Sequence, residues 1–218
     1  MARREDPSPP RDSTPDLPQI LDLVTALGRA GDVVGARVEG LTGDVDASHG
    51  SLVETLWEAP TLDRLDLTGA TLADTRWTEP RIGALVARDA RWRNVEITGG
   101  RIGTADFLRA ELDGVVLRGL RIDYLGLPAA RIGHVRFVGC RFGTLDLPEA
   151  RADRVAFEDC RADEVDTRGL RAAHLDLRGL EALSFTDPAA LRSATLSARQ
   201  AESHGPAFAT ALGIRIVD

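Results

Sequence analysis

Large apolar residues recur every five positions along most of this chain, with polar residues between them. In the stretch 131–150, RIGHVRFVGCRFGTLDLPEA, the second and seventh positions of each block of ten are large and apolar, and the fifth and tenth are small or aliphatic. Neither the 3.6-residue period of a helix nor the sustained two-residue period of a strand produces this spacing. A five-residue beat predicts a short extended segment followed by a corner, repeated along the chain.

Residues twenty positions apart resemble one another more than residues five positions apart. Two such columns are Ala70, Ala90, Ala110, Ala130 and Ala150, and Val95, Val115, Val135 and Val155. This pattern predicts that four segments close one coil and that stacked coils bury their apolar columns inward. We therefore expect a rod whose core contains the central apolar residues, including the three tryptophans Trp57, Trp77 and Trp92.

The units ADFLR (105–109), AELDG (110–114) and LDLTG (65–69) resemble the pentapeptide-repeat family. Its unit is a small residue, a polar residue, a central leucine or phenylalanine, and two more polar residues. The resemblance is clean over 45–184 and implies the family's all-β fold, a right-handed quadrilateral parallel β-helix. Here that fold comprises about seven coils and is roughly 34 Å long. Alternate units depart from the family pattern, because arginine stands where the family often has aspartate or asparagine.

The ends of an open β-helix expose strand edges and need covers. Residues 1–15 are rich in proline and predict a disordered or loosely attached tail. Residues 16–30 predict a capping helix that ends at Gly28. Its apolar face would comprise Leu17, Ile20, Leu21, Val24 and Leu27. The β-helix itself is expected over 31–186, with a slip of register before residue 45.

A second, helical cap is predicted over 187–218, with Asp187 as the helix cap and Pro188 at the first helical position. This segment holds more apolar residues than one cap requires. In the pentapeptide-repeat family, C-terminal segments often form homodimer contacts, and the resemblance implies the same role here. The candidate contact residues are Leu191, Phe208, Leu212, Ile214 and Ile216.

Arginines immediately before the central apolar residues should point outward. One predicted stripe holds Arg81, Arg101, Arg121, Arg141 and Arg161, and an opposite face holds Arg91, Arg131, Arg151 and Arg171. Aspartates such as Asp123, Asp153 and Asp163 stand nearby. The stripes are therefore either a solvated, salt-bridged surface or a partner-binding surface.

An acidic row is the other candidate binding face, and it contains Asp66, Asp106, Asp146 and Asp166. The whole chain carries a formal net charge of −7. Residues 61–181, however, hold 19 arginines and 20 acidic residues, which gives −1. A mimic of duplex DNA needs a dense negative field, and most of the predicted rod lacks one.

No motif in the sequence indicates catalysis, a cofactor or a metal. His134 and His174 share a face but lie two coils apart, too far to bind one ion together. The only cysteines, Cys140 and Cys160, are expected to be reduced and buried in one inner column, which favours a cytoplasmic protein. No apolar stretch is long enough to cross a membrane.

Two functional hypotheses remain open. The first is a non-catalytic protein–protein interaction protein that presents the flat faces of a rigid rod to an unidentified protein partner. The alternative follows from the family resemblance, since some members mimic DNA, bind DNA gyrase and modulate or protect it, which gives quinolone tolerance. Direct nucleic-acid binding by the arginine stripes is less favoured, because acidic residues interrupt them.

Overall fold

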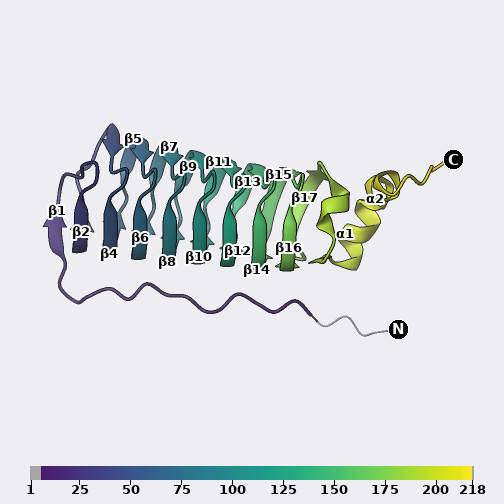
Figure 1. Ribbon diagram of the computed structural model, residues 1–218, viewed down its shortest axis with the longest axis horizontal. Helices are drawn as coiled ribbons and strands as arrows, with labels where there is room; N and C mark the ends of the chain where they lie inside the picture. The colour runs from purple at the N-terminus through teal and green to yellow at the C-terminus, as the bar shows by residue number, and fades with distance from the viewer. Residues whose placement is uncertain (1–5, 218) are drawn as a thin grey trace.

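A long parallel β-solenoid dominates the computed structural model, which describes residues 6–217 (Figure 1). One sheet has ten strands: β1 (Asp22–Val24), β2 (Asp32–Val38), β4 (Ser51–Glu58), β6 (Thr71–Thr78), β8 (Arg91–Thr98), β10 (Glu111–Arg118), β12 (Arg131–Val138), β14 (Arg151–Glu158), β16 (Arg171–Asp176) and β18 (Ala194–Thr195). The other has eight: β3 (Asp44–Asp46), β5 (Thr61–Asp66), β7 (Arg81–Val86), β9 (Arg101–Asp106), β11 (Arg121–Gly126), β13 (Arg141–Asp146), β15 (Cys160–Asp166) and β17 (Leu180–Phe185). The β-helix fold is thus confirmed, with about eight coils where seven were expected.

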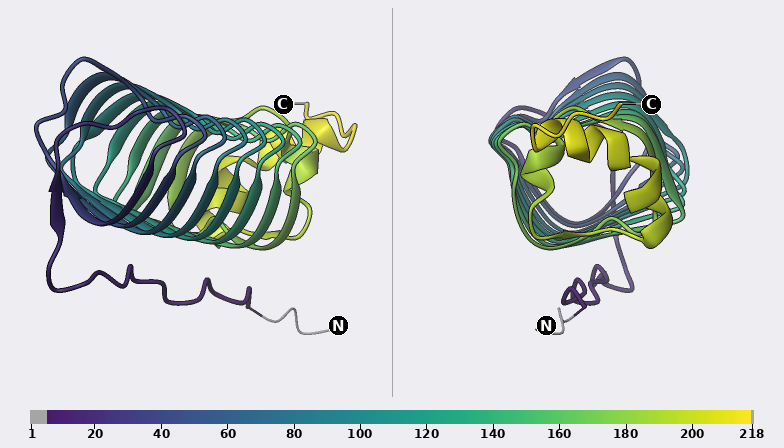
Figure 2. Two further views of the ribbon diagram at one scale, coloured as in Figure 1. Left: turned by 60° about the vertical axis from the view of Figure 1, so that its left-hand side comes forward. Right: turned by 90° about the vertical axis from the view of Figure 1, so that its right-hand side faces the viewer.

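Strand register confirms the twenty-residue coil. Arg81 pairs with Arg101, and Val95 pairs with Val115, in parallel ladders. The first coil is one residue shorter, because Asp32 pairs with Ser51. That is where the sequence pattern slips. Seen along the rod, each coil is a rounded square (Figure 2).

Side chains fill the interior of the rod, as the apolar columns predicted. Trp57 and Trp77 are fully buried, with their ring centroids 5.1 Å apart. Farther along, the rings of Phe137 and Phe157 are stacked at 4.7 Å. An internal void beside Trp92 measures about 20 Å³, which is little more than the space of one water molecule.

The capping helix predicted over 16–30 is wrong. Strand β1 takes its place and pairs in parallel with the first full strand, β2, so that Asp22 faces Ala36. Ile20 and Leu23 are 85% and 64% exposed, instead of forming a packed helix face. The residues between Pro18 and Gly28 are too few for a stable helix alone, whereas strand pairing satisfies the open edge of β2.

Of the disordered or loosely attached tail predicted over 1–15, residues 6–15 have an ordered, extended path against the rod, and residues 1–5 lie outside the described chain. Residues 6–16, which we call the strap, run in extended form along the side of the rod (Figures 1 and 2). The strap begins at an ion pair between Asp6 and Arg178 and ends where the Asp16 amide donates to Asp74.

Short helices cover the C-terminal end of the rod, as predicted: a 3₁₀ turn at Pro188–Leu191, α1 (Ala198–Ser203) and α2 (Gly205–Ala211). The Asp187 side chain accepts a hydrogen bond from the Ala189 amide, which confirms its capping role. Ser197 and Gln200 form a capping box at the start of α1. The Gln200 Nε2 also donates to two carbonyl oxygens of the last coil, those of Leu177 and Leu180, both at 2.7 Å.

Candidate binding faces

Parallel register stacks the first arginine stripe into an unbroken ladder on the eight-stranded sheet. Strands β7, β9, β11, β13 and β15 pair in succession so that their arginines lie side by side, and Glu181 of β17 follows Arg161 in the same register. The members of this arginine ladder are Arg81, Arg101, Arg121, Arg141 and Arg161. They point outward because the residue that follows each of them, such as Ile82, is buried in the core.

The arginine ladder keeps a net positive charge along its middle. The Asp123 carboxylate accepts hydrogen bonds from Arg101 at 2.6 Å and from Arg121 at 3.4 Å. The hydrogen bond from Arg101 is the main reason that the pKa of Asp123 is lowered. Among the described residues, Arg81 and Arg141 have no carboxylate within 4 Å. Across β7, β9, β11 and β13, four ladder arginines therefore face one aspartate.

A shallow groove of about 750 Å³ lies beside the ladder. Its floor contains Gly83 and Gly103, where an added Cβ would lie 2.5 Å from a backbone oxygen of the preceding coil. Glycine is therefore required there by close backbone approach. Arg81 and Arg101 border this floor together with the carboxylates Glu79 and Asp123, and arginine side chains can form paired hydrogen bonds to carboxylates.

The second arginine stripe is interrupted. Glu111 takes the place of an arginine on β10 and lies between Arg91 and Arg131 in the ladder. Its carboxylate is 2.7 Å from Arg131 and 3.9 Å from Arg91. Beyond Glu111, Arg131, Arg151 and Arg171 lie in register, so the unbroken run on this stripe has three arginines, where the arginine ladder has five.

Carboxylates of the predicted acidic row make structural bonds at a corner of the coil. Asp66, Asp106 and Asp166 each accept a hydrogen bond from the backbone amide two residues later. Their other contacts are to cations of the same corner: Arg64 at 2.9 Å from Asp66, Arg88 at 2.6 Å from Asp106, and Arg168 beside Asp166. The structure brings the row together but surrounds it with positive charge.

Asp146 differs from its neighbours in the acidic row, because its partner is neutral. The Tyr124 hydroxyl donates to its carboxylate at 2.6 Å. Burial raises the pKa of Asp146, and the charge of Asp166 acts in the same direction. In contrast, burial opposes but does not overcome the hydrogen bonds from Thr68 and Arg64 that lower the pKa of Asp66.

The predicted dimer contact is divided between the cap and the surface. Leu191 is buried, and Phe208 packs against the core. Leu212, Ile214 and Ile216, in contrast, are 74%, 57% and 59% exposed. The homodimer therefore remains a prediction, carried now by the three exposed residues.

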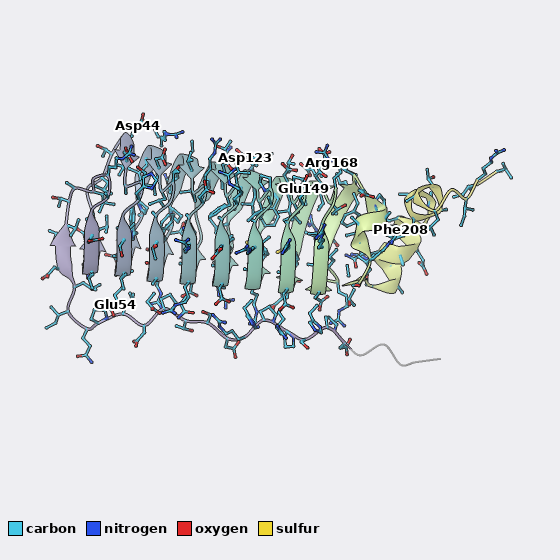
Figure 3. The ribbon with its side chains drawn as sticks, viewed as in Figure 1. Asp44, Glu54, Asp123, Glu149, Arg168 and Phe208 are labelled. Atoms are coloured by element: carbon cyan, nitrogen blue, oxygen red, sulfur yellow. The ribbon has the colours of Figure 1, made fainter. Side chains whose placement is uncertain are left out.

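Sequence reasoning missed a third face, along which the strap lies. Asp74, Asn94, His134 and His174 share one corner column, and all adopt a left-handed backbone conformation. Asparagine, aspartate and histidine tolerate that conformation better than most residues. This residue preference and the length of the proline-rich segment were the two features of the sequence that could have predicted a face covered by the N-terminal segment. Figure 3 shows Glu54, of the same column, near the strap, and Asp123 on the other side of the rod.

Within residues 6–217, no three histidine, cysteine or acidic side chains gather in a way that could hold a metal ion. Cys140 and Cys160 are free thiols in the core. The described chain contains no helix long and apolar enough to cross a membrane.

Comparisons with known proteins are sparse. No family model matches the chain, and no curated protein matches it. Among solved structures, it is similar to a trypsin-treated form of QnrB1, described as a plasmid-mediated fluoroquinolone resistance protein. The identity is 14%, the TM-score is 0.27, and the match covers 90% of this chain and 99% of the other. A likeness at this level gives no basis for assigning a family or a partner, and what stands is the parallel β-solenoid itself.

Proposed function

We propose that this chain is a pentapeptide-repeat protein that acts without catalysis and binds a protein partner on the face that carries the arginine ladder. The observation behind this proposal is the unbroken register of five arginines. Two of them, Arg81 and Arg141, lack a carboxylate partner among the described residues. A rigid sheet offers such a surface with little loss of conformational entropy on binding.

The chemistry of the ladder favours an acidic protein surface as the partner. Neighbouring guanidinium groups repeat at the strand spacing of ~4.8 Å and can each pair with a carboxylate. Nucleic acid is less suitable, because Asp123, Asp163 and Glu164 lie on the same face and the chain carries a net charge of −7. Phosphate recognition favours a clearly basic footprint.

The filled interior supports a non-catalytic role. Small-molecule sites usually enclose several hundred Å³, whereas the void inside this rod is about 20 Å³. The larger grooves lie on the outer surface, between charged side chains. The proposal includes no cofactor.

The alternative, a DNA mimic that binds DNA gyrase, requires free negative charge. Pairing of Asp66 and Asp106 with arginines reduces that charge on the acidic row. We therefore expect no inhibition of gyrase supercoiling at low micromolar concentrations of the purified protein. Strong inhibition, weakened by Asp106→Asn, would favour DNA mimicry over the arginine ladder.

Two matched variants test the proposed face. The first replaces Arg81, Arg121 and Arg141 with glutamine, and the control replaces Arg91, Arg151 and Arg171 with glutamine. Each variant removes three cations. In each, one arginine forms an ion pair longer than 3 Å, Arg121 in the first variant and Arg91 in the control. The other two have no carboxylate within 4 Å among residues 6–217. Tagged full-length proteins would be compared in affinity capture from the organism that encodes them. The partner should be lost with the first variant and kept with the control. Equal capture by both would contradict the proposal.

We also propose that the C-terminal extension joins two copies of the rod. Its residues Leu212, Ile214 and Ile216 are exposed and apolar, and burying them would be favourable. Light scattering should give twice the monomer mass, and replacing all three with aspartate should restore the monomer. A monomeric wild-type protein would exclude this contact.

The two reduced thiols fit a cytoplasmic location.

A further inference from the structure

The backbone of the strap donates to two histidines of the rod. The Ser8 amide donates to His174 Nδ1 at 3.1 Å, and the Arg11 amide donates to His134 Nδ1 at 3.0 Å. Each imidazole therefore accepts at Nδ1 and carries its proton on Nε2. Because the donors are backbone amides, these contacts recognise a chain conformation and not a particular side chain.

The spacing of the acceptors matches an extended proline-type helix. His134 and His174 lie two coils apart, which is ~9.6 Å along the rod. Ser8 and Arg11 are three residues apart, and a polyproline II helix rises ~9.3 Å over three residues. The agreement extends over the whole contact. The eight residue-to-residue steps from Ser8 to Asp16 span ~25 Å, and the five coils beneath them span ~24 Å.

From Pro7 to Ser13 every third side chain faces the rod, which is the periodicity of that helix. Beyond Ser13 the buried residue is Pro15, two positions on, and Asp16 is exposed. Pro7 and Ser13 are partly buried, and Pro10 between them is buried. The Ser13 hydroxyl donates to Asn94 Oδ1 at 2.7 Å. Outward-facing Val116 is only 6% exposed. The buried Pro10 shows that the strap packs an apolar side chain against the rod as well as making polar contacts.

Charged contacts flank the prolines. Arg11 lies 2.8 Å from Asp113, and Arg136 lies 3.5 Å from Asp12. Arg136 also donates to the Pro10 carbonyl oxygen. At the far end, Asp6 lies 3.2 Å from Arg178. A ligand with carboxylates on both sides of a proline pair fits this arrangement.

We propose that this corner of the rod is a binding groove for an extended, proline-containing protein segment, and that the strap is its displaceable internal occupant. The strap groove is lined by Asp74, Asn94, Asp113, His134, Arg136 and His174. It lies on the ten-stranded sheet, away from the arginine ladder, so this inference goes beyond the proposed function and does not depend on it.

The nature of the contacts makes the strap replaceable. Its hydrogen bonds to the rod end on side chains of the rod or come from them, and none joins a β-sheet ladder. Segments held in this way open at a lower free-energy cost than paired core strands. A competing segment must still overcome the effective concentration of the tethered strap, which is in the millimolar range for short connections.

A peptide of residues 5–18 tests the groove in trans. The receptor is the full chain with residues 6–16 replaced by alternating glycine and serine, which removes the prolines and the charged contacts. Fluorescence anisotropy should show the labelled peptide binding this protein about tenfold more tightly than the wild type, whose groove is filled. Absence of binding, or equal binding to both, would overturn the proposal.

Two controls separate the groove from other surfaces. The same receptor with His134→Leu and His174→Leu should lose the peptide, because the two imidazole Nδ1 atoms that accept from the peptide backbone are gone. A control peptide with Pro7, Pro10 and Pro15 replaced by glycine should bind more weakly, because it loses the preformed extended conformation. If the peptide bound the double-leucine receptor as well as its parent, the strap groove would not be the site. If the wild-type protein had twice the monomer mass and lost this doubling when the strap was replaced, the strap would bind the groove of a second copy. That result would also overturn the proposal that the strap occupies the groove of its own chain.

Amide hydrogen exchange of the unmodified full chain tests whether the strap can leave its groove. It remains informative even if the glycine–serine replacement of residues 6–16 destabilises the rod. The amides of Ser8 and Arg11 should exchange more slowly than in the free peptide and much faster than core amides such as that of Val135. Exchange at the rate of the free peptide would mean that the groove is empty in solution. Exchange at the rate of the core would mean that the strap is not displaceable. These exchange rates do not depend on whether the arginine ladder binds a partner. Failure of the proposed function would therefore leave this test unaffected, and failure of this test would leave the proposed function unaffected.

Discussion

Tyr124 reports on the state of the acidic row, because it is the only tyrosine in the chain. Its hydrogen bond to the Asp146 carboxylate, followed by burial, raises its pKa from 10.0 to about 12. Asp106 and Asp166 add to the shift through their negative charge. At pH 11 the phenol should thus be about 10% ionised in the folded protein and about 90% ionised in the unfolded chain.

Absorbance at 295 nm between pH 8 and pH 13 measures this ionisation directly, with circular dichroism recorded in parallel to follow the fold. The folded pKa lies above the unfolded value, so the stabilising contribution of Tyr124 is complete below about pH 10 and is lost as the pH rises through about 12. In guanidinium chloride the midpoint should return to about 10.

Asp146→Asn is the informative variant, and Asp166→Asn is its matched control. Both remove one negative charge near Tyr124, but only the first removes the carboxylate that accepts its hydrogen bond. The midpoint should fall to below about 11 in Asp146→Asn and change less in Asp166→Asn. A wild-type midpoint near 10, or equal shifts in both variants, would refute the interpretation that these carboxylates serve the corner of the coil.

Three further predictions concern the stability of the rod. Phe137→Ala should lower the free energy of unfolding in urea by about 3–5 kcal/mol, because it removes the ring stacked on Phe157, and a loss under 1 kcal/mol would contradict the filled core. Gln200→Ala should cost about 1–3 kcal/mol, because it leaves the Leu180 carbonyl unpaired and the Leu177 carbonyl with only its bond from the Leu180 amide, whereas exposed Glu202→Ala should be nearly neutral. Ellman's reagent should not react with native Cys140 and Cys160, since both are buried, and should titrate two thiols in denaturant; fast native reaction would show that the inner column opens.

The regular part of the fold was predictable because each column repeats one environment. The five-residue beat and the twenty-residue similarity specify which side chains face inward, and Trp57 and Phe137 are buried accordingly. The arginine ladder followed from the same arithmetic. Local signals also sufficed at Asp187, where an aspartate before proline caps a short helix.

The N-terminal end of the rod and the strap were not predictable in this way, because their conformation depends on contacts distant in sequence. Residues 20–27 have helical spacing, yet the unpaired edge of β2 provides hydrogen bonds that favour strand β1. The strap has no apolar period of its own, and its partners lie up to 172 residues away. The acidic row illustrates a different limit: the sequence shows the charges of its aspartates but not the arginines that neutralise them.

Site-specific photocrosslinking tests the central claim, that the arginine-ladder face binds a protein partner, most directly. A benzophenone amino acid would replace Thr104, exposed on β9 beside the ladder, or Thr98, exposed on β8 and away from the ladder. We expect a covalent protein adduct in cells from position 104 and none from position 98. The adduct at position 104 should be lost when Arg81, Arg121 and Arg141 are replaced by glutamine. An adduct at position 98 alone, or one at 104 that survives removal of the arginines, would contradict this claim.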